Sequence, residues 1–235
     1  MRLRLALMLG MLVLGLPSAA SADWIVGAFL GHAWTLASNV TLTLPERQIS
    51  LEIAGVEYRG ESFRSPQYYG VRVAWIPVSR RWISIEGEFI HAKVFSETSR
   101  VVSARGTLRG VPIDASLPLS SIVQRLAMSH GLNFMLANVA LRRDLGRVVG
   151  VVRAGAGPML PHAESTIDFV AREQYQSGGV GTQVGGGLEV ALWRGLGMQG
   201  EYKFTWTSPE IDVAGGTATI PAHSHHLVFG VMYEF

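Results

Sequence analysis

The sequence predicts an all-β fold: an eight-stranded antiparallel transmembrane β-barrel, built as a meander with long extracellular loops and short periplasmic turns. Three observations support it. Beyond residue 22 no apolar stretch is long enough for a membrane-spanning helix, although 48% of the chain is hydrophobic and 27 residues are glycine. Eight segments alternate apolar and polar side chains, and the connections between them alternate long and short. Cysteine is absent, which excludes a disulfide framework and a thiolate site.

The first residues have the layout of a secretory signal peptide. Two arginines precede an apolar run over residues 5–16, and the small residues Ala20-Ser21-Ala22 follow. The run is too short to cross a bilayer as a helix. We therefore expect a signal peptide over residues 1–22 and one outer-membrane β-barrel domain over residues 23–235. The leader removes two basic residues and no acidic ones, so the mature chain is neutral and nucleic acid is not an expected partner.

The eight strand candidates differ in clarity. Five alternate clearly: residues 69–75, 82–90, 180–192, 196–206 and 227–235. Here Tyr202, Phe204, Leu227 and Phe229 would face lipid. Three weaker segments, over residues 24–34, 129–141 and 148–157, complete an even number of strands, as bacterial barrels have. The chain ends on Phe235 behind alternating aromatic residues, which resembles the terminal signal of outer-membrane barrels.

The connections give the topology. With both termini in the periplasm, long connections cover residues 35–67, 94–126, 158–178 and 207–222, and short ones cover residues 77–81, 142–147 and 193–195. This order is expected of long extracellular loops and short periplasmic turns. The short turns also collect arginines, with tryptophans beside them as in an aromatic girdle: Arg80, Arg81, Arg142, Arg143, Arg147 and Arg194, beside Trp75, Trp82 and Trp193.

The predicted inward face carries both charge signs. Its polar members are Arg72, Glu86, Glu88, Arg153, Gln183, Glu189, Gln199, Glu201 and Lys203. Eight strands enclose only enough space for side chains. A plug of ion pairs is therefore favoured over a gated ion pathway, and Glu86 and Glu88 are read as partners of Arg72 or Lys203 rather than as a catalytic pair.

All seven histidines fall near the predicted extracellular end: His32, His91, His130, His162, His223, His225 and His226. Histidine is a common general base and metal ligand near neutral pH. We predict a catalytic set of His130, His162 and His226, and a metal set of His130, His162, His223 and Glu164. The competing interpretation is a group of interfacial histidines, and His91 and His225 share the lipid-facing parity.

Several motifs resemble a known family. The mature chain resembles the small outer-membrane barrels of the OmpX-like superfamily. Closer similarity to lipid A oxidases lies in three stretches: Ser129-His130-Gly131-Leu132-Asn133, Ala154-Gly155-Ala156-Gly157-Pro158 with Pro161-His162-Ala163-Glu164, and Gly200-Glu201-Tyr202-Lys203. The resemblance implies oxygen-dependent oxidation of the proximal glucosamine of lipid A to aminogluconate, with a divalent metal as the candidate cofactor. It supplies no catalytic set that transfers residue by residue.

The expected partners are outer-membrane lipids and lipopolysaccharide, and we expect a monomer in the outer membrane of a Gram-negative cell. Nearly all basic residues of the mature chain are arginines, many in the long loops, and arginine binds phosphate bidentately. Two other functions stay open. One is a non-enzymatic OmpX-like barrel for envelope integrity, adhesion or host interaction. The other is a lipid A deacylase with Ser224 as nucleophile and His226, or a histidine of a neighbouring strand, as base.

Overall fold

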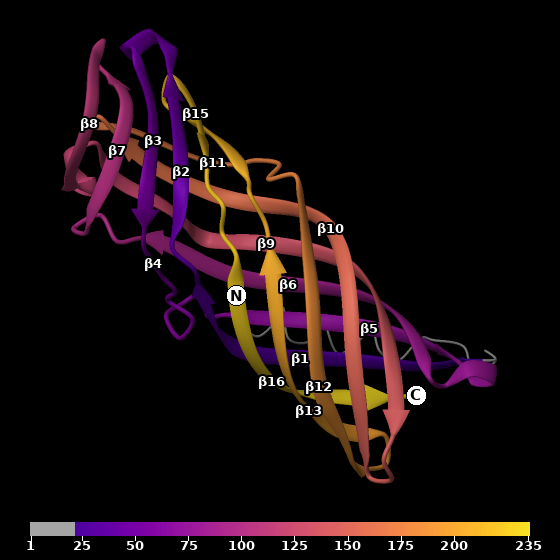
Figure 1. Ribbon diagram of the computed structural model, residues 1–235. Helices are drawn as coiled ribbons and strands as arrows, with labels where there is room; N and C mark the ends of the chain where they lie inside the picture. The colour runs from indigo at the N-terminus through magenta and orange to yellow at the C-terminus, as the bar shows by residue number, and fades with distance from the viewer. Residues whose placement is uncertain (1–21) are drawn as a thin grey trace, which may run out of the picture.

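The computed structural model describes residues 22–235, so the predicted leader, apart from Ala22, lies outside the described residues. Eight strands form the barrel, and each pairs antiparallel with the next (Figure 1). They are β1 (Ala22–Thr35), β5 (Tyr69–Pro77), β6 (Ile83–Ser96), β9 (Val123–Asp144), β10 (Val148–Ile167), β12 (Val180–Trp193), β13 (Leu196–Trp206) and β16 (Ser224–Glu234). The pairing of β1 with β16 closes the sheet, and the predicted eight-stranded meander is confirmed.

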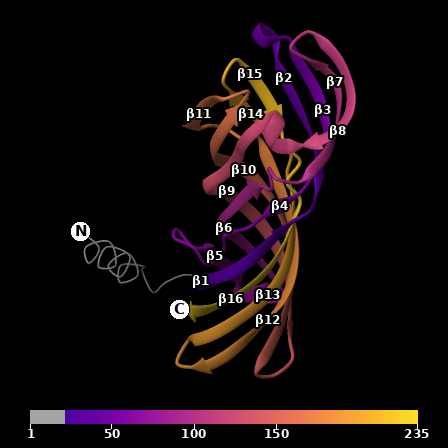
Figure 2. The same ribbon diagram turned by 90° about the vertical axis from the view of Figure 1, so that its left-hand side faces the viewer.

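Both ends of the described chain lie at the short-turn end of the barrel. The amide of Phe235 donates to the carbonyl of Trp24 at 2.9 Å. Arg81, in the first short turn beside the 3-10 helix η2 (Val78–Arg80), binds Asp23 at 2.8 Å and Glu234 at 3.0 Å. The long connections therefore gather at the opposite end, as Figure 2 shows.

The predicted faces of the strands are also confirmed. Tyr202, Leu227 and Phe229 are exposed on the outer wall, and Phe204 is partly exposed there. All nine predicted inward polar residues are buried. An exposed band of valine, leucine and aromatic side chains surrounds the barrel, which is the surface expected against lipid. Among the described residues, no helix is long and apolar enough to cross a bilayer.

The lumen is filled by ion pairs. Arg72 lies 2.9 Å from Glu88 and 2.6 Å from Glu201, and Arg153 lies 2.8 Å from Glu86. The remaining members of the network are Lys203, Arg142 and Glu189, so four cations meet four carboxylates. Arg142 belongs to β9 and binds Glu189 at 2.6 Å, although the sequence placed it in a turn. The cavity in the network holds about 10 Å³, about the volume needed for one water. This is the predicted plug.

Two strands run further than predicted. β9 has 22 residues and β10 has 20, whereas a barrel strand needs about 9 to 11 residues to cross a bilayer. Their outer halves continue the sheet beyond the barrel, where β10 pairs with β11 (Val170–Tyr175) and β6 with β4 (Tyr58–Arg59). The predicted loops over residues 94–126 and 158–178 are therefore partly strand.

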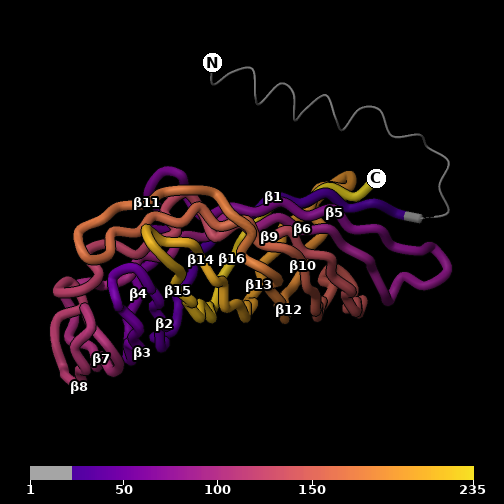
Figure 3. The backbone as a smooth tube through the Cα atoms, turned by 90° about the horizontal axis from the view of Figure 1, so that it is seen from above, coloured from indigo at the N-terminus to yellow at the C-terminus, as the bar shows by residue number. Residues whose placement is uncertain are grey.

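A second sheet forms from segments of the predicted loops over residues 35–67, 94–126 and 207–222. Its order is β14-β15-β2-β3-β7-β8. The strands are β2 (Ser38–Leu44), β3 (Ile49–Val56), β7 (Val101–Leu108), β8 (Val111–Pro118), β14 (Glu210–Val213) and β15 (Gly216–Thr219), with the 3-10 helices η1 (Pro45–Arg47) and η3 (Leu119–Ser121). Leu42, Leu51 and Ile211 on this sheet share one hydrophobic core with Leu126 and Ile167 of β9 and β10. Figure 3 shows β2, β3, β7 and β8 beyond one end of the barrel.

Candidate metal centre on the outer wall of the barrel

Four metal-ligating side chains gather where β9, β10 and β11 leave the barrel. They are His130 of β9, His162 and Glu164 of β10, and Glu173 of β11, and one donor atom from each lies within 4.8 Å of all the others. We call these four residues the metal cluster. The β10–β11 register accounts for two members, because it places Glu164 directly opposite Glu173. Two histidines and two carboxylates are donors that divalent transition metals take.

An irregularity in the β9–β10 ladder brings His130 into the metal cluster. Pairing runs regularly to Pro161↔Leu132, shifts, and resumes at Glu164↔Ala127. Gly131 stands in this shift with a φ of +112°, and a β-carbon there would clash with Asn133 and His91. Bulges of this kind redirect side chains near functional sites. Here the bulge turns His130 to the outer wall, although its parity along β9 is that of the inward residues.

The donor atoms face one another closely. His130 Nδ1 lies 3.4 Å from Glu164 Oε1, and His162 Nε2 lies 3.3 Å from Glu173 Oε1. The two imidazole rings meet edge to face with centroids 4.7 Å apart. The His162 side chain is 9% exposed, and its buried Nδ1 has no hydrogen-bond partner among the described residues. Because an unsatisfied buried donor or acceptor is costly, this nitrogen fits a metal-binding role.

Neighbouring side chains hold the ligands in place. Arg125 Nε donates to Glu164 Oε2 at 2.6 Å. The Ser129 hydroxyl donates to Glu164 Oε1, and its oxygen lies 3.0 Å from His130 Nδ1. The ring of Tyr175 lies 4.3 Å from that of His162. Such outer contacts fix the orientation of ligands before a metal binds.

The metal cluster adjoins an amphipathic groove on the lipid-facing wall, between β5 and β10. Its lower part is a hollow of about 340 Å³ with an apolar floor of Tyr69, Phe89, Met135 and Leu160. At the top of this hollow His91 Nδ1 lies 2.9 Å from Asn133 Oδ1, next to His130. The upper part is a hollow of about 300 Å³ lined by the cations Arg59, Lys93 and Arg125 and by the carboxylates Glu61 and Glu164. Apolar surface thus lies towards the membrane, and charged side chains with one more cation than carboxylates lie towards the outside.

The structure does not bring His223 or His226 into the metal cluster. His226 is fully buried in the barrel mouth, 3.1 Å from the Tyr68 hydroxyl and 2.9 Å from Thr205 Oγ1. His223 accepts a hydrogen bond from the amide of Thr207 at 3.3 Å. Since β16 pairs with β13 and β1, it stands away from β9 and β10. The structure therefore does not place the predicted catalytic residue His226 or the predicted ligand His223 beside His130 and His162.

Glu173 is the member that sequence reasoning missed. The segment that carries it was read as loop, and its role depends on the β10–β11 hairpin placing it beside Glu164. The alternation of small and polar residues over 170–175 is weak, so only the pairing itself reveals it. His162 was expected after its strand and lies within β10.

Comparisons with known proteins give distant structural similarities. No protein-family model and no curated protein matches this sequence. The solved structure of OprG from Pseudomonas aeruginosa is 9% identical, with a TM-score of 0.46, covering 92% of this chain and 96% of that chain. AlkL is 12% identical with a TM-score of 0.46 and 94% coverage of both chains. Neisserial surface protein A is 10% identical with a TM-score of 0.44, covering 93% of this chain and 100% of that chain. The evidence that this barrel is closed is the pairing of β1 with β16, not these distant similarities.

Proposed function

We propose that this protein is an outer-membrane enzyme of a Gram-negative bacterium that oxidises lipid A at a metal centre held by His130, His162, Glu164 and Glu173. One observation carries the proposal: this donor set lies on the lipid-facing wall at the extracellular end of the barrel, and the buried Nδ1 of His162 has no hydrogen-bond partner within residues 22–235. In an outer membrane, lipid A would form the leaflet beside that end of the barrel. An active centre there would meet its substrate from the side, without passage through the plugged lumen.

The residues of the metal cluster suit iron(II). Two histidines and one carboxylate on one side of an ion, with open positions opposite, are the ligand pattern of non-haem iron oxygenases. His130, His162 and Glu164 supply that pattern, and Glu173, whose side chain is 62% exposed, stands at its solvent side. When bound, iron(II) supplies the means to activate oxygen. Zinc would also suit these donors and would favour hydrolysis instead, so metal identity separates two reaction classes.

The groove matches the chemistry of lipid A. Acyl chains would lie against Tyr69, Phe89, Met135 and Leu160 in the apolar hollow. A phosphate on the distal sugar would meet the cations of the upper hollow, where arginine can bind phosphate bidentately. His130 lines both hollows, so the sugar between chains and phosphate would lie beside the metal cluster.

The proposed reaction follows from the aminogluconate product that the sequence resemblance implies. The C1 hemiacetal of the proximal glucosamine loses two electrons and two protons and becomes a lactone. Molecular oxygen accepts the two electrons and the two protons and leaves as hydrogen peroxide. Water then opens the lactone to the acid. C1 must therefore carry a free hydroxyl, and lipid A with a phosphate on C1 should not be oxidised.

A second candidate function, lipid A deacylation, is favoured by a different observation. Ser129 contacts both His130 and Glu164, which are the residue types of a hydrolase triad. However, Ser129 and Glu164 approach the same nitrogen of His130, whereas a relay needs the imidazole between them. Ser224, the nucleophile considered from sequence, is buried and its hydroxyl lies 2.8 Å from Thr35 Oγ1. Oxidation is therefore the primary proposal.

Mass spectrometry tests the proposal on lipid A from expressing cells whose lipid A carries a free C1 hydroxyl. Cells with the parent protein should yield lipid A that has gained one oxygen atom, whereas cells with H162A or E173Q should yield the unmodified form. The matched control is H225A, because His225 is an outer-wall histidine on β16 that contacts Tyr202 instead of the metal cluster. Heat-resistant migration verifies that each barrel has folded.

Each other outcome assigns a different function. Loss of an acyl chain that depends on Ser129 would establish deacylation. Lipid A that is identical with and without the parent protein would return it to the non-enzymatic barrels, and oxidation that persists in H162A would remove the metal cluster from the mechanism.

A further inference from the structure

A second groove lies on the outer wall on the opposite side of the segment that borders the metal centre. Residues 60–66, here called the strap, cross the wall between β4 and β5 and line hollows on both sides. The hollow away from the metal cluster measures about 550 Å³ and lies over β1 and β16. It is lined by Leu30, Gly31, His32, Trp34, Phe63, Leu227 and Phe229. We call it the strap groove.

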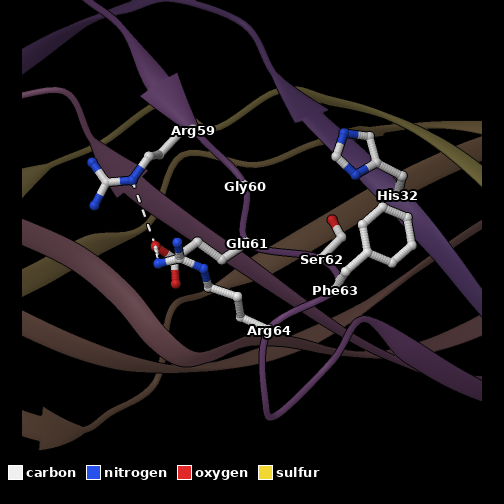
Figure 4. A pocket seen from close by; sticks show the side chains of 7 residues that line it. All are labelled: His32, Arg59, Gly60, Glu61, Ser62, Phe63 and Arg64. Carbon is white, nitrogen blue, oxygen red and sulfur yellow. Dashed lines mark hydrogen bonds and ion pairs between the residues drawn. The ribbon is translucent and has the colours of Figure 1, made fainter.

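Hydrogen bonds attach the strap to the barrel wall, so its exposed side chains are held at defined positions over the groove. The amide of Ala33 donates to Ser62 Oγ at 3.2 Å, and the amide of Tyr68 donates to the Ser62 carbonyl at 2.7 Å. Phe63 stacks on His32 with centroids 5.5 Å apart and planes at 9°, as Figure 4 shows. Yet Phe63 is 76% exposed. A phenylalanine held outward over an apolar hollow marks a surface for an apolar partner.

Charged residues stand above this apolar surface. Arg59 and Arg64 both reach Glu61, at 3.6 Å and 3.3 Å, around a hollow of about 360 Å³ (Figure 4). Arg59 also binds Glu97 at 3.4 Å. The charged hollow is therefore lined by two guanidiniums and one carboxylate. The Arg64 side chain is 78% exposed, so a phosphate can reach its guanidinium.

A buried nitrogen of His32 lies between the apolar hollow and the charged hollow. His32 lines both the apolar and the charged hollow. Its Nδ1 is buried and has no hydrogen-bond partner among the described residues. A polar group that lies between acyl chains and a phosphate, such as a sugar hydroxyl or an amide, would satisfy it.

From this arrangement we propose that the strap groove binds a phosphorylated, acylated sugar lipid, namely the lipid A part of lipopolysaccharide, as a non-catalytic docking site. An acyl chain lies against Leu30, Trp34 and Phe63, and a phosphate meets the exposed guanidinium of Arg64. The groove differs from the metal centre in its strands and its apolar lining. The proposal therefore stands whether or not the protein oxidises lipid A.

Photocrosslinking in living cells tests this site directly. Phe63→p-benzoylphenylalanine should give an adduct that carries lipopolysaccharide. Phe169, which is 75% exposed in the turn between β10 and β11, is the matched position and should give little adduct when replaced in the same way. Arg64→Ala should lower the adduct at position 63 about tenfold, the factor expected for one lost charge-assisted contact. Arg105→Ala should not, since Arg105 is similarly exposed and pairs with Asp114 on the extracellular sheet.

A binding measurement covers variants in which the crosslinker disturbs folding. Purified protein in detergent, without iron, is examined by native mass spectrometry with diphosphorylated lipid A, dephosphorylated lipid A or phosphatidylglycerol. The F63A/R64A variant should bind diphosphorylated lipid A about tenfold more weakly than F169A/R105A does. Equal binding by the two variants, no dependence on phosphate, an adduct that R64A leaves unchanged, or preference for phosphatidylglycerol would each overturn the proposal.

Discussion

Replacing Lys203 tests the ion-pair plug that organises the barrel interior. Its ammonium is fully buried, contacts Glu88, and lies 3.6 Å from Glu201. Lys203→Met keeps an unbranched side chain that is one atom shorter, and it leaves four buried carboxylates with three guanidiniums. Removal of one partner from a buried ion pair costs about 3–5 kcal/mol, because the remaining charge loses its compensation. We expect a loss of that size in the free energy of unfolding, measured by urea titration of the barrel in detergent micelles.

A double variant separates the ion pair from packing. Glu88→Gln combined with Lys203→Met removes one charge of each sign, and we expect a coupling energy of about 1–3 kcal/mol between the two substitutions. Lys93→Met is the control, because in the part of the chain that the structure describes this buried lysine on the outer wall donates only to a carbonyl. About 1 kcal/mol should be lost there. A Lys203→Met barrel within about 0.5 kcal/mol of the parent would refute the account of the lumen.

Three further predictions concern the extracellular end. Gly131→Ala should cost about 1–3 kcal/mol through backbone strain and should weaken metal binding measured by calorimetry, because Gly131 has a φ of +112°. The hydrogen bond from Arg109 lowers the pKa of Asp168. The stabilisation from this contact therefore exists above the unfolded pKa of about 3.9 and is lost as pH falls through the lower folded pKa. D168N and the parent should differ in hydrogen exchange of the extracellular sheet at neutral pH and should converge in acid. Burial raises the pKa of Tyr58 to about 12, so stability is lost as pH rises from about 10 to 12, and Y58F should remove that loss in alkaline unfolding.

Each of these has an internal check. Gly87 has open space around its Cα in β6, so Gly87→Ala should be tolerated; equal losses at both glycines would argue against strain at the bulge. If D168N and the parent still differed in hydrogen exchange at the lowest pH, the pH dependence could not be assigned to the Asp168 carboxyl. An identical alkaline transition in Y58F would mean that another group controls it.

The barrel could be predicted because its signal is periodic and repeated. A period of two reports which face of a strand is buried, and eight consistent segments with alternating connections leave few other folds. The same period runs through Leu42 and Leu44 and through Ile49, Leu51 and Ile53, which are buried in the second sheet. Alternation reports burial on one side and does not distinguish a membrane strand from an extracellular one, so these segments were read as loops.

The site could be predicted only in part. His130 and His162 come from strands that are neighbours in the meander, so their meeting follows from topology. His226 was chosen because its parity points inward, and it does point inward, but the metal cluster is on the outer wall. The bulge at Gly131 reverses the direction of His130, and a local reversal of this kind is invisible to parity. Glu173 required knowledge of a hairpin register.

The most direct test of the central claim is iron-dependent turnover by the purified barrel. Metal-free protein receives one equivalent of iron(II) without oxygen, then lipid A with a free C1 hydroxyl, then oxygen. The parent should form hydrogen peroxide and the aminogluconate product in equal amounts, and H162A should form neither while it keeps the folded, heat-resistant barrel. Unmodified lipid A with the iron-loaded parent, or equal product from H162A, would contradict the assignment of catalysis to the His130–His162–Glu164–Glu173 cluster.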